Sequence, residues 1–346
     1  MNPREGPIMK MKSGILVVVV MMALGFVLST GARGLGAEKK YPIKPIQVVI
    51  AFQPGETDNI LRPFVEKLPE YLGQPVSFIY KPGAAGSVGA GFVAKAKPDG
   101  YTLIGTSQSS VVINPLTQKD VGYTWDSFVP IGVVAEGTLI LALQANARWK
   151  TLNDLVEEAK KNPGRISYTS PGTLNIMHLG TEAFCEKAGI QLNHIPAQGS
   201  GPAVTAMLGG HVDLASTGLS PAIAHIKAGT VRVLAVFNDK RKQALPGVPT
   251  FLEMGYPAVV TTKVGFLAPK GTPQEVIETL HGALKKVVEN HQAFINERID
   301  KIGSEVDFMG PAEHEAFLKK ENDFFEIAGF FSKPFNVENM IEEIKK

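Results

Sequence analysis

The sequence is almost free of cysteine, since Cys185 is the only one among 346 residues. A single cysteine excludes an internal disulfide, whatever the redox state of the compartment. Cys185 lies in the segment LGTEAFCEKAG, where helical spacing places it on one face with Leu179, Ala183 and Ala188. Because a free cysteine on an apolar face is usually buried and inert, we expect a small core residue rather than a reactive thiol.

Signatures of catalysis, metal binding and nucleotide binding are also missing. The chain contains no G-x-S-x-G elbow, no H-E-x-x-H pair, no P-loop and no two histidines at metal-ligand spacing on one helix. The glycines of residues 83–89 follow the spacing G-x-x-G-x-x-G, which differs from the dinucleotide fingerprint G-x-G-x-x-G. We therefore expect no catalytic residue, no metal and no cofactor. Three carboxylates, Glu56, Asp58 and Asp213, could meet in a cleft, which leaves acid–base chemistry open.

A large charge of either sign is absent, because 35 Lys and Arg residues face 33 Asp and Glu residues. The N-terminus has a basic stretch with Arg4, Lys10 and Lys12, then an apolar run at 15–28 and small residues up to Ala37. This order is typical of a secretory signal, and about 14 apolar residues fall short of the roughly 20 that span a bilayer. We expect cleavage after Ala37. Cleavage removes four basic residues and one acidic residue, and the resulting charge near −1 gives no reason to expect binding to nucleic acid or to an anionic membrane.

The remaining chain is long enough for two domains, and its most informative stretch runs from Ile46 to Arg62. An apolar strand leads into a Pro-Gly turn, after which Thr57, Asp58 or Asn59 can cap a helix. In an open α/β sheet such a junction lies at the carboxyl edge of the strands, where ligands usually bind, and the helix start offers N–H groups to an anion. A purely structural turn is the alternative reading.

Polar loops of the same design recur along the chain. The residues at these positions are, in chain order, Thr106, Ser107, Ser170, Thr173, Asn175, Gln198, Gly199 and Ser220. Such repetition predicts a cleft lined by backbone amides and short polar side chains rather than by a charged catalytic array. His178 falls in the first turn of one of these helices, and its ring can either fix the loop or contact a ligand.

Several segments, taken together, resemble one known family. They are YPIKPIQVVIAFQPGETD, GQPVSFIYKPGAAGSVGA, KPDGYTLIG, ISYTSPGTLNIMHLG, GSGPAVTAMLGGHVDLA and LPGVPTFLEMGYP. In this order and spacing, from Tyr41 to Phe330, the chain resembles the extracytoplasmic solute receptors of tripartite tricarboxylate transporters, often called Bug-type receptors. The resemblance implies an α/β fold of the type II periplasmic-binding-protein class with two lobes, each a mixed sheet flanked by helices. Residues 38–140 and 265–346 would form the first lobe and residues 141–264 the second.

The resemblance also implies which residues contact the ligand. They are Phe52, Gln53, Gly55, Glu56, Thr57, Asp58, Thr106 and Ser107 from the first lobe, and Ser170, Thr173, Asn175, His178, Gln198, Gly199 and Thr217 from the second. Two positions depart from the family pattern: Glu56 replaces the second glycine of P-G-G, and Ala197-Gln198 stands where a tyrosine and a lysine are more often found. A carboxylate at position 56 would repel an anionic ligand unless it points away, is protonated or meets a cationic group. These departures weaken the case for a tricarboxylate and leave room for a monocarboxylate, an amino-acid-like solute or an aromatic acid.

The function implied by the resemblance is that of a periplasmic receptor without enzymatic activity. It would capture a small carboxylate or amino-acid-like solute by hinge closure and deliver it to the membrane subunits of a tripartite tricarboxylate transporter. A monomer is expected, because the two lobes must move freely. Two alternatives stay open. One is an orphan receptor that feeds a sensor, and the other is a secreted enzyme on the same scaffold with Asp58, His178 or Glu56 as acid or base.

Overall fold

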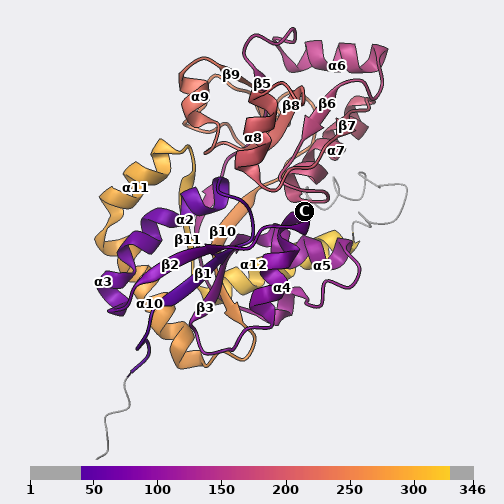
Figure 1. Cartoon of the computed structure of the whole chain (residues 1–346). Helices are drawn as coiled ribbons and strands as arrows, with labels where there is room; N and C mark the ends of the chain where they lie inside the picture. Colours follow the sequence, from indigo (N-terminus) through magenta and orange to yellow (C-terminus); the bar gives the residue numbers. More distant parts are fainter. Residues whose placement is uncertain (1–39, 328–346) are drawn as a thin grey trace, which may run out of the picture. The chain divides into compact units, whose positions relative to one another are not determined.

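The computed structural model describes residues 40–327, and their strands form two mixed sheets (Figure 1). The predicted secretory signal at residues 1–37 and the charged tail at residues 336–346 lie outside the described residues. Across residues 40–327, no helix combines the length and the apolar character that a bilayer crossing requires.

The first sheet contains six of the described strands in the order β11-β4-β10-β3-β1-β2. Their bounds are β1 (Ile46–Ile50), β2 (Val76–Tyr80), β3 (Thr102–Ser107), β4 (Phe128–Gly137), β10 (Thr262–Pro269) and β11 (Glu305–Met309). The strands β1, β2 and β3 are parallel, whereas β10 is antiparallel to both β3 and β4, and β11 is antiparallel to β4. Because the parallel strands end at the same edge, the loops that follow β1 and β3 lie side by side.

Helices cover both faces of this sheet (Figure 1). One face carries α2 (Glu56–Lys67), α3 (Pro69–Leu72), α10 (Gln274–Asn290) and α11 (Gln292–Lys301). The other face carries α4 (Ser87–Ala94), α5 (Asn114–Thr117) and α12 (Pro311–Ile327), with the short turns η1 (Ala84–Gly86) and η2 (Ser109–Ile113). Ile60, Leu61 and Phe64 form the fully buried stripe of α2, and Gly105 of β3 leaves room for Leu61. This packing fixes the start of α2 at the edge of the sheet.

The second sheet contains five of the described strands in the order β7-β6-β8-β5-β9. Their bounds are β5 (Leu139–Gln144), β6 (Ser167–Thr169), β7 (Asn193–His194), β8 (Leu214–Gly218) and β9 (Val231–Val236). The strand β6 is parallel to β7 and β8, and β5 is antiparallel to β8 and β9. This sheet is therefore mixed as well, with the ends of β6 and β8 at one edge.

Alternate residues of β5 face different helix layers, as the two-residue period of a strand requires. Leu139, Leu141 and Leu143 belong to the same buried cluster as residues of α6 (Leu152–Lys161) and α7 (Ile176–Ala188). Ile140 and Ala142 pack instead with residues of α8 (Ser200–Leu208) and α9 (Ile223–Lys227). Cys185 of α7 is free and only 4% exposed, and burial raises the pKa of its thiol. The prediction of a buried, unreactive cysteine is confirmed in its placement.

Two helix starts differ from the sequence prediction. The helix α2 begins at Glu56 with Gly55 as its N-cap, so the prediction of a cap at Thr57, Asp58 or Asn59 is wrong. Asp58 is the third helical residue, and its Oδ1 accepts the Gly55 N–H at 2.6 Å, as a capping box does from inside the helix. The sequence also predicts Ser220 as an N-cap with Pro221 at the first helical position, but α9 begins at Ile223, because residues 219–222 form a separate turn.

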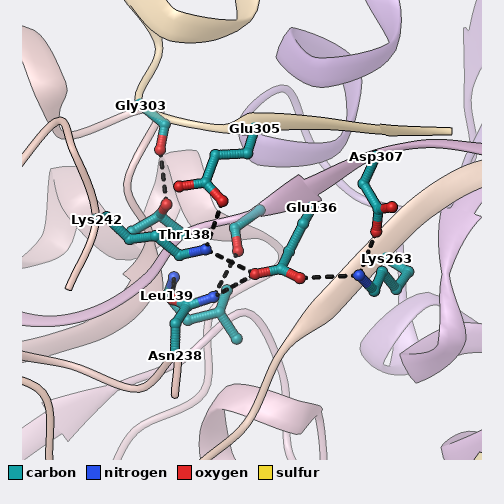
Figure 2. Close-up of polar contacts among 10 residues, drawn as sticks. Glu136, Thr138, Leu139, Asn238, Lys242, Lys263, Gly303, Glu305 and Asp307 are labelled. Carbon is teal, nitrogen blue, oxygen red and sulfur yellow. Dashed lines mark hydrogen bonds and ion pairs between the residues drawn. The ribbon is translucent and has the colours of Figure 1, made fainter. Parts of the chain in front are cut away.

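Within the described residues, the chain passes between the two sheets twice. Only Thr138 separates β4 from β5, and the return runs from the end of β9 to the start of β10. Asn238 ties the two passages together: its side chain donates to the Gly137 carbonyl at 3.2 Å and accepts the Leu139 N–H at 3.1 Å. Thr138 donates to the Gly303 carbonyl at 2.6 Å. Figure 2 shows these contacts converging at the crossing.

An ion-pair cluster lies beside this crossing, and we call Glu136, Lys242, Lys263, Glu305 and Asp307 the crossing cluster (Figure 2). Glu136 pairs with Lys242 at 2.7 Å and with Lys263 at 2.9 Å. Lys242 also reaches Glu305 at 3.0 Å, and Lys263 contacts Asp307. Burial alone would raise the pKa of Glu136, but the two lysines outweigh it and hold that pKa below its usual value. The cluster therefore joins the second passage to β4 and β11.

We expect Lys242→Met to lower the free energy of unfolding by about 1–3 kcal/mol, because it removes a buried cation from Glu136, which keeps only Lys263, and from Glu305. The Lys242 side chain is only 6% exposed. Lys270→Met is the matched control, since its pair with Asp126 is exposed and should contribute under about 1 kcal/mol. Urea unfolding of both variants tests this. Equal losses would show that the crossing cluster adds no more than a surface ion pair.

Candidate functional site

A small cavity lies where the loops of the two sheets meet. Its described lining residues are Phe52, Gln53, Glu56, Thr57, Ser107, Ser109, Pro171, Asn175, Ile176, Met177, Ser200, Thr262 and Val264. They come from the loop after β1, the first turn of α2, the segments after β3 and β6, the starts of α7 and α8, and β10. The parallel strands β1, β3 and β6 therefore all deliver their carboxyl ends to this cavity, the usual place for a ligand in α/β folds.

Loops from the two sides touch across the cavity. The Gln53 N–H donates to the Gln198 carbonyl at 3.0 Å. Gly201 lies against the Pro54 carbonyl with no room for a side chain, and a Cβ at Gly172 would lie 2.7 Å from the Ala85 Cβ. The cavity has a volume of about 20 Å³, which is the space of roughly one water molecule. This arrangement is therefore a closed one.

Glu56 reaches from α2 to the turn that follows β8. It is 5% exposed, and its Oε2 accepts the Ser220 N–H at 2.8 Å. Asn59, one turn of α2 further on, donates from Nδ2 to the Ser220 hydroxyl at 3.1 Å. Two glycines make room for the carboxyl group: a Cβ at Gly218 would collide with it, and a Cβ at Gly137 would lie 3.0 Å from Oε1. The carboxyl group thus sits in a fitted recess, with Oε1 left without a hydrogen-bond partner.

The electrostatics of this recess favour the neutral acid. Burial raises the pKa of the Glu56 carboxyl to about 7, against the opposing effect of its hydrogen bonds to Ser220 and with a small additional rise from the charge of Asp58. No lysine, arginine or histidine belongs to the described lining of the cavity. A negative charge at Glu56 is therefore not neutralised from within the cavity.

The structure brings six of the sequence-predicted ligand residues to the cavity. They are Phe52, Gln53, Glu56, Thr57, Ser107 and Asn175. Gln198 and Gly199 lie directly behind this lining, since the Gln198 carbonyl accepts from Gln53 and a Cβ at Gly199 would lie 3.1 Å from the Gln53 carbonyl oxygen. The loop after β1, which contains Gln53, and the loop that contains Gln198 and Gly199 thus lie on opposite sides of the same cavity.

The other predicted residues do not belong to the described lining. Gly55 is the N-cap of α2, and Thr173 is exposed. Thr106 donates to the Ser110 hydroxyl at 2.9 Å, Ser170 donates to the Gly172 carbonyl at 3.0 Å, and Thr217 donates to the Ser200 carbonyl at 3.3 Å. These hydroxyl groups hold the loops that form the cavity.

Asp58 and His178, the other two residues considered as acid or base, do not belong to the described lining and have partners of their own. Asp58 accepts from Gly55, from Arg62 at 3.0 Å and from Tyr80 at 3.0 Å. His178 accepts the Leu174 N–H on Nδ1 at 3.0 Å, so its ring fixes the loop that lines the cavity. Burial, with a smaller effect of His194, lowers the pKa of His178 to about 3, which keeps the ring neutral.

Sequence reasoning missed several lining residues. They are Ser109, Pro171, Ile176, Met177, Ser200, Thr262 and Val264. The polar run after the strand of residues 101–106 includes Ser109, and Ser200 starts a helix in the G-S-G-P segment, so both carried a local signal. Thr262 and Val264 carried none, because they reach the cavity only through the pairing of β10 with β3 and β4. Across residues 40–327, no group of three or more His, Cys, Asp or Glu side chains is placed to hold a metal ion.

Comparison with known proteins places the chain among periplasmic receptors. The model of the tripartite tricarboxylate transporter family receptor matches residues 60–323. The UPF0065 protein in the gbd 5' region of Cupriavidus necator is 33% identical over 320 residues, which cover 88% of this chain and 95% of the relative. The solved periplasmic binding protein BugD is 31% identical with a TM-score of 0.77, and the match covers 83% of this chain and 98% of BugD. The protein Rpa4515 of R. palustris, solved with adipate, is 27% identical with a TM-score of 0.78, and the match covers 83% of this chain and 96% of that protein.

These matches confirm the α/β fold of two mixed sheets and the Bug-type resemblance that the sequence motifs carry. The family and these solved neighbours are solute-binding proteins of the periplasm rather than enzymes. The chain belongs to the receptor family of the tripartite tricarboxylate transporters.

Proposed function

We propose that this receptor captures a small carboxylate solute in the cavity between its two sheets and delivers it to the membrane subunits of a tripartite tricarboxylate transporter. The adipate-bound relative supports the carboxylate class, and the family match supports the partner. We further propose a monomer with lobes at 38–140 plus 265–346 and at 141–264, located in the periplasm after cleavage at Ala37.

Two orphaned polar atoms, each on a residue that lines the cavity, carry this proposal. Glu56 Oε1 and Ser109 Oγ are buried without a hydrogen-bond partner, and both residues line the cavity. Such atoms are rare, because leaving one unpaired costs about 1–3 kcal/mol. A polar solute that bonds to both atoms recovers this cost when it binds. The orphaned atoms therefore support a polar ligand at this place.

Capture requires the cavity to open and close. Its volume of about 20 Å³ is far too small for a dicarboxylate, so the loops that touch across it must separate to admit one. The two chain passages at Thr138 and Asn238 are the covalent links about which the sheets can turn. Hinge closure around a ligand at such a crossing is an established mode of domain motion.

We expect the mature chain, from Glu38 onward, to bind at least one member of a panel of acetate, benzoate, glutamate, adipate and citrate with a Kd of order micromolar.

Ser109→Ala should weaken that binding about 3- to 10-fold without lowering the melting temperature, because its hydroxyl has no partner in the free protein. Ser304→Ala is the matched control, since its buried hydroxyl is also unpartnered but does not line the cavity. Thermal shift and calorimetry measure both effects. Absence of binding by every carboxylate of the panel would contradict the proposal.

A second prediction concerns closure. Gly201→Ala places a methyl group against the Pro54 carbonyl in the closed arrangement, so it should weaken solute binding roughly tenfold or more. Small-angle scattering should show that the variant stays more open than the wild type at saturating solute. Gly282→Ala is the control, because nothing lies within 4 Å of a Cβ at that position of α10. If both variants bind and close like the wild type, closure does not bring Gly201 against Pro54.

The partner is tested by crosslinking the solute-loaded receptor to solubilised membranes of the source organism, with solute-free receptor as the control. We expect membrane subunits of a tripartite transporter to be recovered only with solute, because the closed form is the one delivered. Recovery of a sensor protein instead would favour the orphan receptor.

A further inference from the structure

We propose that Glu56 meets the solute as a neutral acid, donating a hydrogen bond from Oε1 to a carboxylate of the solute, so that capture takes up one proton from solvent. This inference rests on the proposed function, since it concerns the same cavity and a carboxylate solute. Glu56 then determines the sign of the charge that a solute group must carry at this end of the cavity.

The two oxygens of Glu56 have different surroundings. Oε2 already accepts the Ser220 N–H at 2.8 Å, which is the bond expected of the carbonyl oxygen of a protonated carboxyl group. Oε1 is buried and has no partner, and Glu56 is part of the cavity lining. The recess left by Gly137 and Gly218 holds the group in this orientation. Oε1 is therefore the oxygen to which we assign the proton, since it is the one left without a partner, and the opening that admits solute would expose it.

Charge in and around the cavity supports the same assignment. The described lining has no cationic side chain, and residues 217–222, which are the end of β8 and the turn that Glu56 contacts, have no charged side chain. An ionised Glu56 beside a solute carboxylate would place two like charges together out of water, which disfavours double ionisation. A neutral acid instead forms an O–H···O⁻ hydrogen bond, which is short and charge-assisted. The proton replaces the cation that this cavity lacks.

Charged groups on the neighbouring elements do not supply that cation. Asp58 on the same helix adds negative charge, and Arg62 is paired with Asp58 at 3.0 Å. Glu136, beside Gly137 on β4, and Lys263, between Thr262 and Val264 on β10, are paired with each other at 2.9 Å in the crossing cluster. Because burial raises the pKa of Glu56 to about 7, the proton is available at neutral pH.

The test is calorimetric titration of adipate, or of the tightest-binding carboxylate of the panel above, from about pH 6 to about pH 8.5 in buffers of different ionisation enthalpy. We expect the Kd of the wild type to rise about tenfold per pH unit above the pKa of Glu56. Proton uptake should approach one per solute above the pKa that Glu56 has in the solute-free protein and fall toward zero below it. Tighter binding at high pH would overturn the inference and indicate an ionised Glu56 that pairs with a cationic solute group.

Two variants separate Glu56 from other titrating groups. Glu56→Gln keeps an acceptor for Ser220 and presents an N–H donor toward the solute at every pH, so binding should lose both its pH dependence and its proton uptake. Glu321→Gln is the control, because burial also raises the pKa of Glu321 on α12 to about 7, yet Glu321 does not line the cavity. It should keep both. A Glu56→Gln variant with the pH profile of the wild type would overturn the inference.

The protonation of Glu56 can also be tested without any solute, through the pH dependence of the melting temperature. The folded protein holds the Glu56 proton up to about pH 7, whereas the unfolded chain loses it near the ordinary value of 4.5. The folded state therefore binds more protons in this window, and the contribution of Glu56 to stability falls as pH rises through it. The melting temperature of Glu56→Gln minus that of the wild type should rise from about pH 5 to about pH 8. A constant difference would overturn the inference.

Failure of this inference can be told apart from failure of the proposed function. If no carboxylate of the panel binds at any pH, the proposed function fails, and with it the bond from Glu56 to a solute carboxylate. If a carboxylate binds with a flat pH profile and without proton uptake, the function stands and the role of Glu56 is refuted.

Discussion

The crossing between the two sheets is the constraint on which the rest of the structure depends. One amide side chain, that of Asn238, bonds to the backbone on both sides of Thr138, so the two passages are held to each other rather than to either sheet alone. The crossing cluster adds charge pairs between the same passages and β11. Each sheet keeps its own ladder of hydrogen bonds, so this short region is where the proposed hinge motion between the sheets would act.

The close contact between loops on the two sides of the cavity depends on glycine residues. Gly201 and Gly172 each stand where a methyl group would meet atoms of the opposite loop, and Gly199 takes a positive φ of 139° beside Gln53. Glycine costs backbone entropy, and three of them in facing loops would be a poor choice for a rigid binding surface. They suit loops whose backbones must come into direct contact when the cavity closes. The peptide groups themselves, through Gln53 and Gln198, then form part of the closure contact.

The sequence predicts the succession of strands, polar loops and helices along the chain, but it does not predict several contacts of the site. The loops after β1 and β6 were predicted to border a cleft because polar residues follow apolar strands there, and Gln53 and Asn175 do line it. The place of Thr262 in the cavity lining could not be predicted, because it depends on the long-range pairing of β10 between β3 and β4. Asp58 was expected to meet a ligand, and His178 either to fix its loop or to contact a ligand, and nearby backbone N–H groups engage both. Short-range bonds of this kind compete with any ligand for the same polar atoms.

Glu56 links protonation to the arrangement of the sheets, whether or not solute is present. Part of the burial that raises its pKa comes from the contact of α2 with the end of β8 and the Ser220 turn. Separation of these elements would return the carboxyl group to water and its pKa toward the ordinary value. By linkage, a proton that binds the closed arrangement more tightly must also favour closure to the same extent. A lysine at this position would supply a fixed charge to a solute carboxylate, but its own desolvation would oppose closure at every pH below its pKa. The carboxyl group of Glu56 opposes closure only while it is ionised. The proposed bond to solute requires the protonated form, in which no charge is buried and this cost disappears.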